Sequence, residues 1–118
     1  MYLAYIIVAA IFTFMLSMSA RMKLMREPVA VEVIGETVGV PLRLFPILAA
    51  LEIAGGAGLL IGIGLEPLGV AAAACLVLYF VVAIGAHVRR RDLAPGHLIP
   101  AVVMLAISAA AMVLRLAA

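Results

Sequence analysis

Long apolar stretches separated by short polar segments dominate this chain. A helix needs about 20 apolar residues to cross the hydrocarbon core of a membrane. Four stretches meet this length, and they cover residues 2–20, 44–65, 68–88 and 98–116. Because lipid offers backbone groups no hydrogen-bond partner, each stretch is predicted to be an α-helix rather than a strand. The pattern therefore predicts an all-α integral membrane protein, a single domain built as an antiparallel bundle of four transmembrane helices.

The connection between the first two spans carries a pattern of its own. Pro28 can start a helix and Gly39 can end one. Between them the valine and isoleucine residues separate from the two glutamates onto opposite helix faces. We expect a short amphipathic helix over residues 28–38 that lies in the membrane interface.

Basic residues gather on one side of the predicted bundle. The first and third connections carry Arg21, Lys23, Arg26, Arg43, Arg89, Arg90 and Arg91. The N-terminus, a tight turn predicted at Glu66-Pro67 and Arg115 fall on the other side. By the positive-inside rule, both termini are expected outside the cytoplasm, with the protein in the plasma (inner) membrane. A signal peptide is a poor interpretation of the first span, because the positive charge follows the apolar run instead of preceding it.

Composition supports the membrane assignment and narrows the functional classes. The chain is 69% hydrophobic and 12% charged, whereas an average soluble domain is about 45–50% apolar and about 25% charged. Nucleic acid is not expected as a partner, because no basic stripe with interleaved aromatic residues is present. The only cysteine, Cys75, excludes an internal disulfide or a cysteine-based zinc site, and no metal is expected. Tryptophan is absent, so any aromatic belt must come from tyrosine and phenylalanine residues, Tyr79 among them.

One carboxylate, Glu52, lies inside the second predicted span. A charge there costs about 2.5–3.5 kcal/mol on insertion scales, so such a group is usually paired, neutralised or used. Ser19 and Lys23 end the first span and His87 ends the third, on the same membrane side, so a buried Glu52–Lys23 or Glu52–His87 pair is expected. This polar cluster is the candidate ligand-binding or proton-linked site. In the alternative interpretation, Lys23 and His87 are interfacial anchors and Glu52 is a neutral packing carboxyl.

Glycines follow Glu52 at helical spacing along the same span. Gly55, Gly58 and Gly62 are expected to serve helix packing, and the last two form a GxxxG motif. A phosphate-binding loop is excluded because no basic GK[ST] sequence follows. Four short spans make a thin core, so we expect the bilayer plus either further copies of the chain or a larger membrane complex as partners. A purely structural interpretation is a bundle that oligomerises through this glycine face.

Taken in order, several motifs resemble the DoxX-like family of small four-span membrane proteins. They are Ser19 with Lys23-Leu24, Val38-Gly39-Val40-Pro41, Leu51-Glu52-Ile53-Ala54-Gly55 followed by Gly58-Leu59-Leu60, and Gly85-Ala86-His87. The likeness covers most of the chain, and it departs at Ala20, where the family often has glycine after the serine.

The resemblance implies a role in membrane redox chemistry. The family takes its name from a subunit of a thiosulfate:quinone oxidoreductase, and other members are linked to redox or thiol-stress systems. It implies a non-catalytic accessory subunit, with quinone contact near Glu52 and His87 and with Lys23 as a further position of interest. The residues themselves form no complete catalytic constellation, in keeping with such a role.

The alternative hypothesis is a small proton-coupled multidrug exporter that uses Glu52. Small multidrug-resistance transporters also have four spans and one membrane carboxylate. They carry that glutamate in the first span beside tryptophans, whereas this chain has it in the second span and has no tryptophan.

Overall fold

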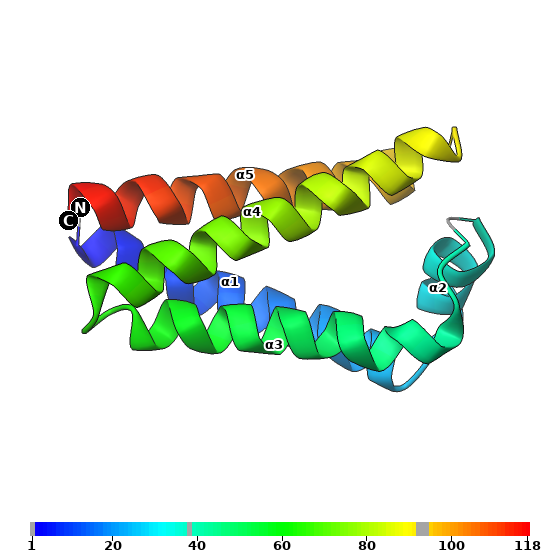
Figure 1. The fold of residues 1–118 in the computed structure, drawn as a ribbon, viewed down its shortest axis with the longest axis horizontal. Helices are drawn as coiled ribbons and strands as arrows, with labels where there is room; N and C mark the ends of the chain where they lie inside the picture. Colours follow the sequence, from blue (N-terminus) through cyan, green and yellow to red (C-terminus); the bar gives the residue numbers. More distant parts are fainter. Residues whose placement is uncertain (1, 38, 92–94) are drawn as a thin grey trace.

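The computed structural model describes residues 2–37, 39–91 and 95–118 and shows a helical bundle (Figure 1). The long helices are α1 (Tyr2–Leu24), α3 (Phe45–Ile61), α4 (Glu66–Arg89) and α5 (Pro95–Ala117). Four helical segments are long and apolar enough to cross a membrane, and the described residues form no strand. The predicted all-α bundle of four transmembrane helices is confirmed.

The turn between α3 and α4 lies earlier in the chain than Glu66-Pro67, where the sequence predicted it. It occupies residues 62–65, while Glu66 and Pro67 form the first turn of α4. Proline lacks a backbone N–H that the first turn would leave unpaired anyway, and it is therefore tolerated there. A carboxylate in the first turn also interacts favourably with the helix dipole. These two residues start the helix instead of connecting two helices.

The long helices are arranged as two pairs that form a wedge. Packing is most extensive between α1 and α3 and between α4 and α5. Figure 1 shows α3 and α4 meeting at the end where both termini lie and separating towards the opposite end. We call the first of these the closed end and the second the wide end.

Glycines allow the close approach of α3 and α4 towards the closed end. A Cβ atom added at Gly58 would lie 2.7 Å from the Cβ of Ala72, and one at Gly55 would lie 2.5 Å from Leu76 Cδ2. Gly62 faces the backbone of Gly69, where no Cβ would fit. The glycine face of the second span is therefore covered by α4 of the same chain. This finding overturns the interpretation in which that face drives oligomerisation.

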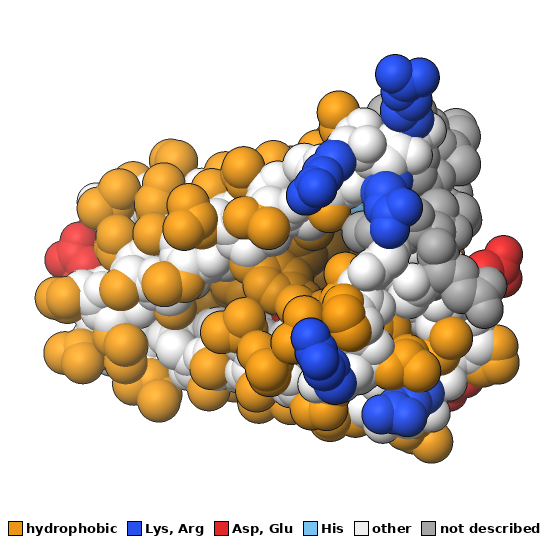
Figure 2. Space-filling model, turned by 45° about the vertical axis from the view of Figure 1, so that its right-hand side comes forward, with side chains coloured by type: hydrophobic (Ala, Val, Ile, Leu, Met, Phe, Trp, Pro, Cys, Tyr) orange, Lys and Arg blue, Asp and Glu red, His pale blue; other side chains and the backbone are white. Residues whose placement is uncertain are grey.

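The outer surface of the bundle is apolar. Figure 2 shows hydrophobic side chains over most of the visible face. Large side chains such as Leu3, Phe14, Ile47 and Leu78 are exposed, while Tyr5, Phe12, Leu16 and Leu59 are fully buried in the core. Soluble monomers rarely expose apolar area on this scale. The surface is thus in contact with the lipid bilayer, as predicted.

A short helical segment lies at the wide end between α1 and α3. It consists of α2 (Pro28–Ala30) and η1 (Val31–Thr37), and η1 is wound as a π-helix. The 3-10 turn η2 (Leu42–Leu44) then leads into α3. Of the amphipathic helix predicted over 28–38, Val38 lies outside the described residues. The placement of this helical segment in the membrane interface stays a prediction.

Candidate functional site

A cavity of about 1110 Å³ lies between the two helix pairs. Ligand pockets of globular proteins commonly measure about 300–1,000 Å³, so this volume admits more than a small head group. All four long helices contribute to its walls, together with η1. Figure 2 shows the cavity as a hollow with hydrophobic walls. Hydrogen-bonding groups on the walls come from Ser19, Lys23, Tyr79 and His87.

A buried ion pair lies beside this cavity, which is lined by its lysine. Lys23 on α1 and Glu52 on α3 are paired through Nζ and Oε1, and Glu52 is completely buried while Lys23 is 7% exposed. Lys23 Nζ also donates a hydrogen bond to Ser19 Oγ at 2.8 Å. Ser19 and Lys23 are four residues apart and therefore neighbours on one helix face. Of the two partners considered for Glu52, the structure brings Lys23 to it.

Tyr79 on α4 completes the cluster. Its hydroxyl group donates a hydrogen bond to Glu52 Oε1 at 3.0 Å, so the cluster joins three helices. From the sequence, Tyr79 was counted only among the residues available for an aromatic belt. A buried tyrosine hydroxyl usually finds a polar partner, and Tyr79 lies two helical turns before His87. That spacing was the signal that could have placed it on the same face of the third span. We refer to Ser19, Lys23, Glu52 and Tyr79 as the polar cluster.

The second carboxylate oxygen of Glu52 is unsatisfied. Oε2 is buried and makes no hydrogen bond with any described residue. Leaving a buried acceptor unpaired costs about 1–3 kcal/mol. The cluster therefore retains one unused acceptor at Glu52 Oε2, while Ser19 and Lys23, which line the cavity, retain donor capacity.

His87 lies in the last turn of α4, buried and on the cavity wall. It therefore shares the cavity with Ser19, Lys23 and Tyr79. A metal site is not formed by the described residues, which contain no group of three or more His, Cys, Asp or Glu side chains able to hold an ion. The chemistry available in the cavity is hydrogen bonding to an otherwise apolar molecule.

A second group of polar contacts, not predicted from the sequence, lies at the closed end. Arg115 on α5 is buried, and its Nε donates a hydrogen bond to the carbonyl oxygen of Gly62 at 2.8 Å. Its guanidinium group lies 5.6 Å from the ring centres of both Tyr2 and Tyr5. Tyr5 in turn donates to the carbonyl oxygen of Leu59 at 2.7 Å. These contacts satisfy carbonyl groups at the C-terminal end of α3, where a helix lacks internal partners.

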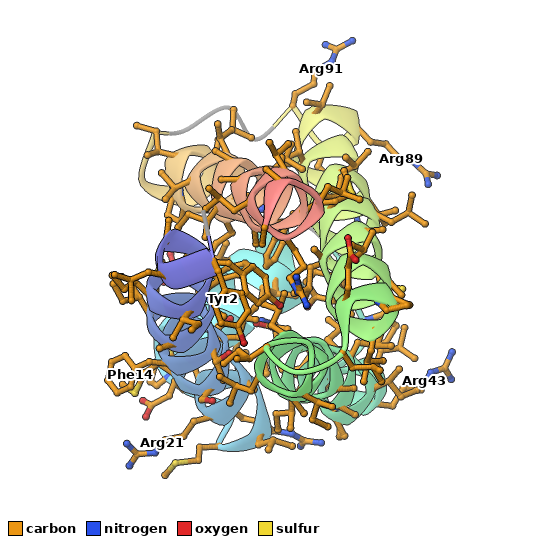
Figure 3. The ribbon with its side chains drawn as sticks, turned by 90° about the vertical axis from the view of Figure 1, so that its left-hand side faces the viewer. Tyr2, Phe14, Arg21, Arg43, Arg89 and Arg91 are labelled. Atoms are coloured by element: carbon orange, nitrogen blue, oxygen red, sulfur yellow. The ribbon has the colours of Figure 1, made fainter. Side chains whose placement is uncertain are left out.

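Arg115 differs from the arginines at the wide end in being buried. Figure 3 shows Tyr2 pointing into the middle of the bundle, whereas Arg21, Arg43, Arg89 and Arg91 point away from it. From the sequence, Arg115 served only to assign an orientation. No local pattern distinguishes an arginine that binds a neighbouring helix end from one that faces water.

Comparison with known proteins gives one match. A model of the DoxX-like family matches residues 7–111, a segment that contains the entire polar cluster and His87. No curated protein and no solved structure matches this chain.

Proposed function

Because this chain belongs to the DoxX-like family, we propose that it is a non-catalytic accessory subunit of a membrane redox system and holds a quinone in its cavity. The observation that carries this proposal is the large apolar cavity with the hydrogen-bond donors Ser19 and Lys23 on its α1 wall. Ligand sites typically combine an apolar lining with a few polar groups that fix orientation.

The donors on that wall suit a carbonyl group. Lys23 uses two of its three N–H groups on Glu52 and Ser19, and the Ser19 hydroxyl accepts one of them and can still donate. Quinone carbonyl oxygens are neutral acceptors on an apolar ring. A neutral acceptor requires no counter-charge. The Lys23–Glu52 pair offers no net charge, because its two charges cancel.

The same neutrality argues for a binding role rather than a catalytic one. Glu52 and Lys23 bind each other, and Tyr79 binds Glu52, so these groups hold one another in place. A fixed, internally paired cluster orients a ligand. Electron transfer to or from the quinone then belongs to a partner subunit of the redox system.

We assign the wide end to the cytoplasmic side of the plasma (inner) membrane. Arg21 and Arg89 lie in the last turns of α1 and α4 at that end. Arg43 in η2 and Arg91 directly after α4 lie there too, and Figure 3 shows the side chains of all four directed away from the bundle. The positive-inside rule then directs both termini away from the cytoplasm. In this orientation the redox partner, or a further copy of the chain, contacts a surface other than the glycine face, because α4 already covers that face.

Purification in mild detergent from native membranes tests this proposal. We expect quinone extracted from the sample to approach one molecule per chain, together with copurifying redox subunits. Replacement Ser19→Ala removes a donor from the cavity wall and is expected to lower the quinone content. The matched control is Ser17→Ala, because Ser17 is exposed and its hydroxyl donates to the Thr13 carbonyl group of its own helix. A solitary protein without quinone, and without a redox phenotype on deletion, would refute the proposal.

The exporter remains the second candidate because the cavity is lined by Lys23, the partner of a buried membrane carboxylate, while the opposite end of the bundle is closed. Transporters that alternate between two openings pass through such one-sided states. Against it, Glu52 is held by Lys23 and Tyr79. Proton flux measured in proteoliposomes with a drug substrate decides the matter: flux unchanged by Glu52→Gln excludes the exporter.

A further inference from the structure

The cavity is open sideways, between α3 and α4. Leu51 on α3 lines it and is 54% exposed, and Leu78 and Val82 on α4 line it and are each 67% exposed. A residue that both lines a cavity and remains exposed marks its rim. By this measure Phe14 and Met18 on α1 mark a further part of the rim, away from the face shown in Figure 2. Figure 2 shows the hollow on this face, between the ribbons of α3 and α4 seen in Figure 1. In a membrane-spanning bundle this rim faces lipid tails.

The end of the cavity that faces the aqueous side is covered by apolar residues. Val33 and Ile34 of η1 and Val40 of the following loop line it there. Gly39 has a φ angle of +86° and lies directly against the guanidinium group of Arg90, at the C-terminal end of α4. This contact ties the loop before α3 to the end of α4, so the covering segment bridges both helix pairs.

The polar cluster and the sideways opening lie at the same depth. Leu51 precedes Glu52 on α3, and Leu78 precedes Tyr79 on α4. A ring bound at the polar cluster therefore has its apolar substituent next to the rim. The cavity volume of about 1110 Å³ exceeds what a quinone ring alone would fill.

Building on the proposed function, we propose that the cavity is loaded from the bilayer through the gap between α3 and α4, and that the prenyl tail of the bound quinone lies in this gap. The ring binds at Ser19 and Lys23, and the tail passes between Leu51 and Val82 into the lipid. The ligand class is accordingly a tailed quinone and not a water-soluble one.

Photocrosslinking of the full chain in lipid nanodiscs tests the inference. The probe is a prenylated benzoquinone with a diazirine in the first part of its tail, and crosslinked peptides are mapped by mass spectrometry. We expect labels on the segments that contain Leu51 and Leu78 to Val82. Val82→Trp fills the gap and is expected to lower the yield about tenfold, equivalent to about 1.4 kcal/mol of binding.

A matched control lies next to this residue. Val81 is also exposed, at 48%, but does not line the cavity, so Val81→Trp is expected to leave the crosslinking yield unchanged. Binding of a tail-less benzoquinone, measured in parallel, shows that the Val82→Trp protein is folded and that its ring site is intact.

The possible outcomes separate the inference from the proposed function. If both quinones bind equally well and Val82→Trp has no effect, the tail does not use this gap and the inference is wrong. Labels confined to the outer surfaces of α1 and α5 would also overturn it. A diazirine phospholipid that labels the same residues and is not displaced by quinone would assign the gap to lipid instead. If neither quinone binds the wild-type chain, the proposed function itself fails.

Discussion

The two ends of this bundle are built on different physical principles. At the closed end, Gly58 and Gly62 let backbones approach closely, and Arg115 binds a helix-end carbonyl group. At the wide end the helix pairs separate, and a buried ion pair lies beside a cavity. In lipid, helices gain no hydrophobic driving force from associating, so close packing and polar contacts must supply it. Concentrating the tight packing at one end leaves the other free to hold a ligand.

The largest expected effect is at the wide end. Lys23→Met removes one partner of the buried pair and strands the Glu52 carboxylate, which is expected to lower the free energy of unfolding by about 3–5 kcal/mol. The double variant Lys23→Met/Glu52→Gln carries no stranded charge and is expected to recover much of this loss. Denaturation with SDS in mixed micelles measures both. Equal losses in the single and double variants would show that the stranded Glu52 charge is not the cause of the loss.

A steric change at the closed end is expected to rank second. The Cβ atom of Gly62→Ala would meet the backbone of Gly69, which cannot rotate away. We expect a loss of about 2–3 kcal/mol in the free energy of unfolding, as for other overpacked sites. Gly85→Ala is the matched control, because nothing lies within 4 Å of a Cβ atom there. That variant should be neutral or slightly stabilising, since alanine favours helix more than glycine does.

Removing the arginine contact at the closed end is expected to lower the free energy of unfolding by a smaller amount. Arg115→Met keeps the apolar stem but leaves the Gly62 carbonyl without its donor, for a loss of about 1–2 kcal/mol. Arg89→Met serves as control, because the Arg89 side chain is exposed and points away from the bundle (Figure 3). Thermal unfolding in mild detergent distinguishes the two. A control as destabilised as Arg115→Met would assign the effect to net charge instead of to the contact.

The smallest expected effect compares one tyrosine at each end. Tyr79→Phe removes the hydrogen bond to Glu52 and is expected to cost about 1 kcal/mol. Tyr2→Phe removes the bond to the Ile63 carbonyl group, where the side chain is exposed and another polar group can replace it. We expect a smaller loss there, measured by the same SDS titration. The reverse order would mean that the closed end depends more on single hydrogen bonds than the wide end does.

The fold was accessible from the sequence because each span is defined by local hydropathy. The four apolar stretches predicted four spanning helices, and these are present. The observed helices differ from the predicted spans at their ends, as at Glu66 and Pro67, which begin α4. End positions depend on a few capping contacts of about 1 kcal/mol each, which are weaker signals than a run of 20 apolar residues.

The candidate site could be predicted only in part from the sequence. The cost of a charge in lipid identified Glu52 as requiring a partner, and shared membrane depth reduced the candidates to Lys23 and His87. Choosing between them required the rotation and spacing of α1 and α4 around α3. Tyr79 was missed because its spacing from His87 indicates only a shared helix face, whereas the carboxylate that its hydroxyl meets lies on another helix.

The sequence by itself determined that this chain spans a membrane four times and that Glu52 requires compensation within it. The tertiary structure alone decided that Lys23 and Tyr79 bind Glu52, that α4 covers the glycine face, and that Arg115 joins α5 to the end of α3. The physical reason is that lipid and protein interior are equally apolar. Hydropathy therefore establishes that a residue lies in the membrane but not which helix it faces, and that choice is made by close packing and a few polar contacts.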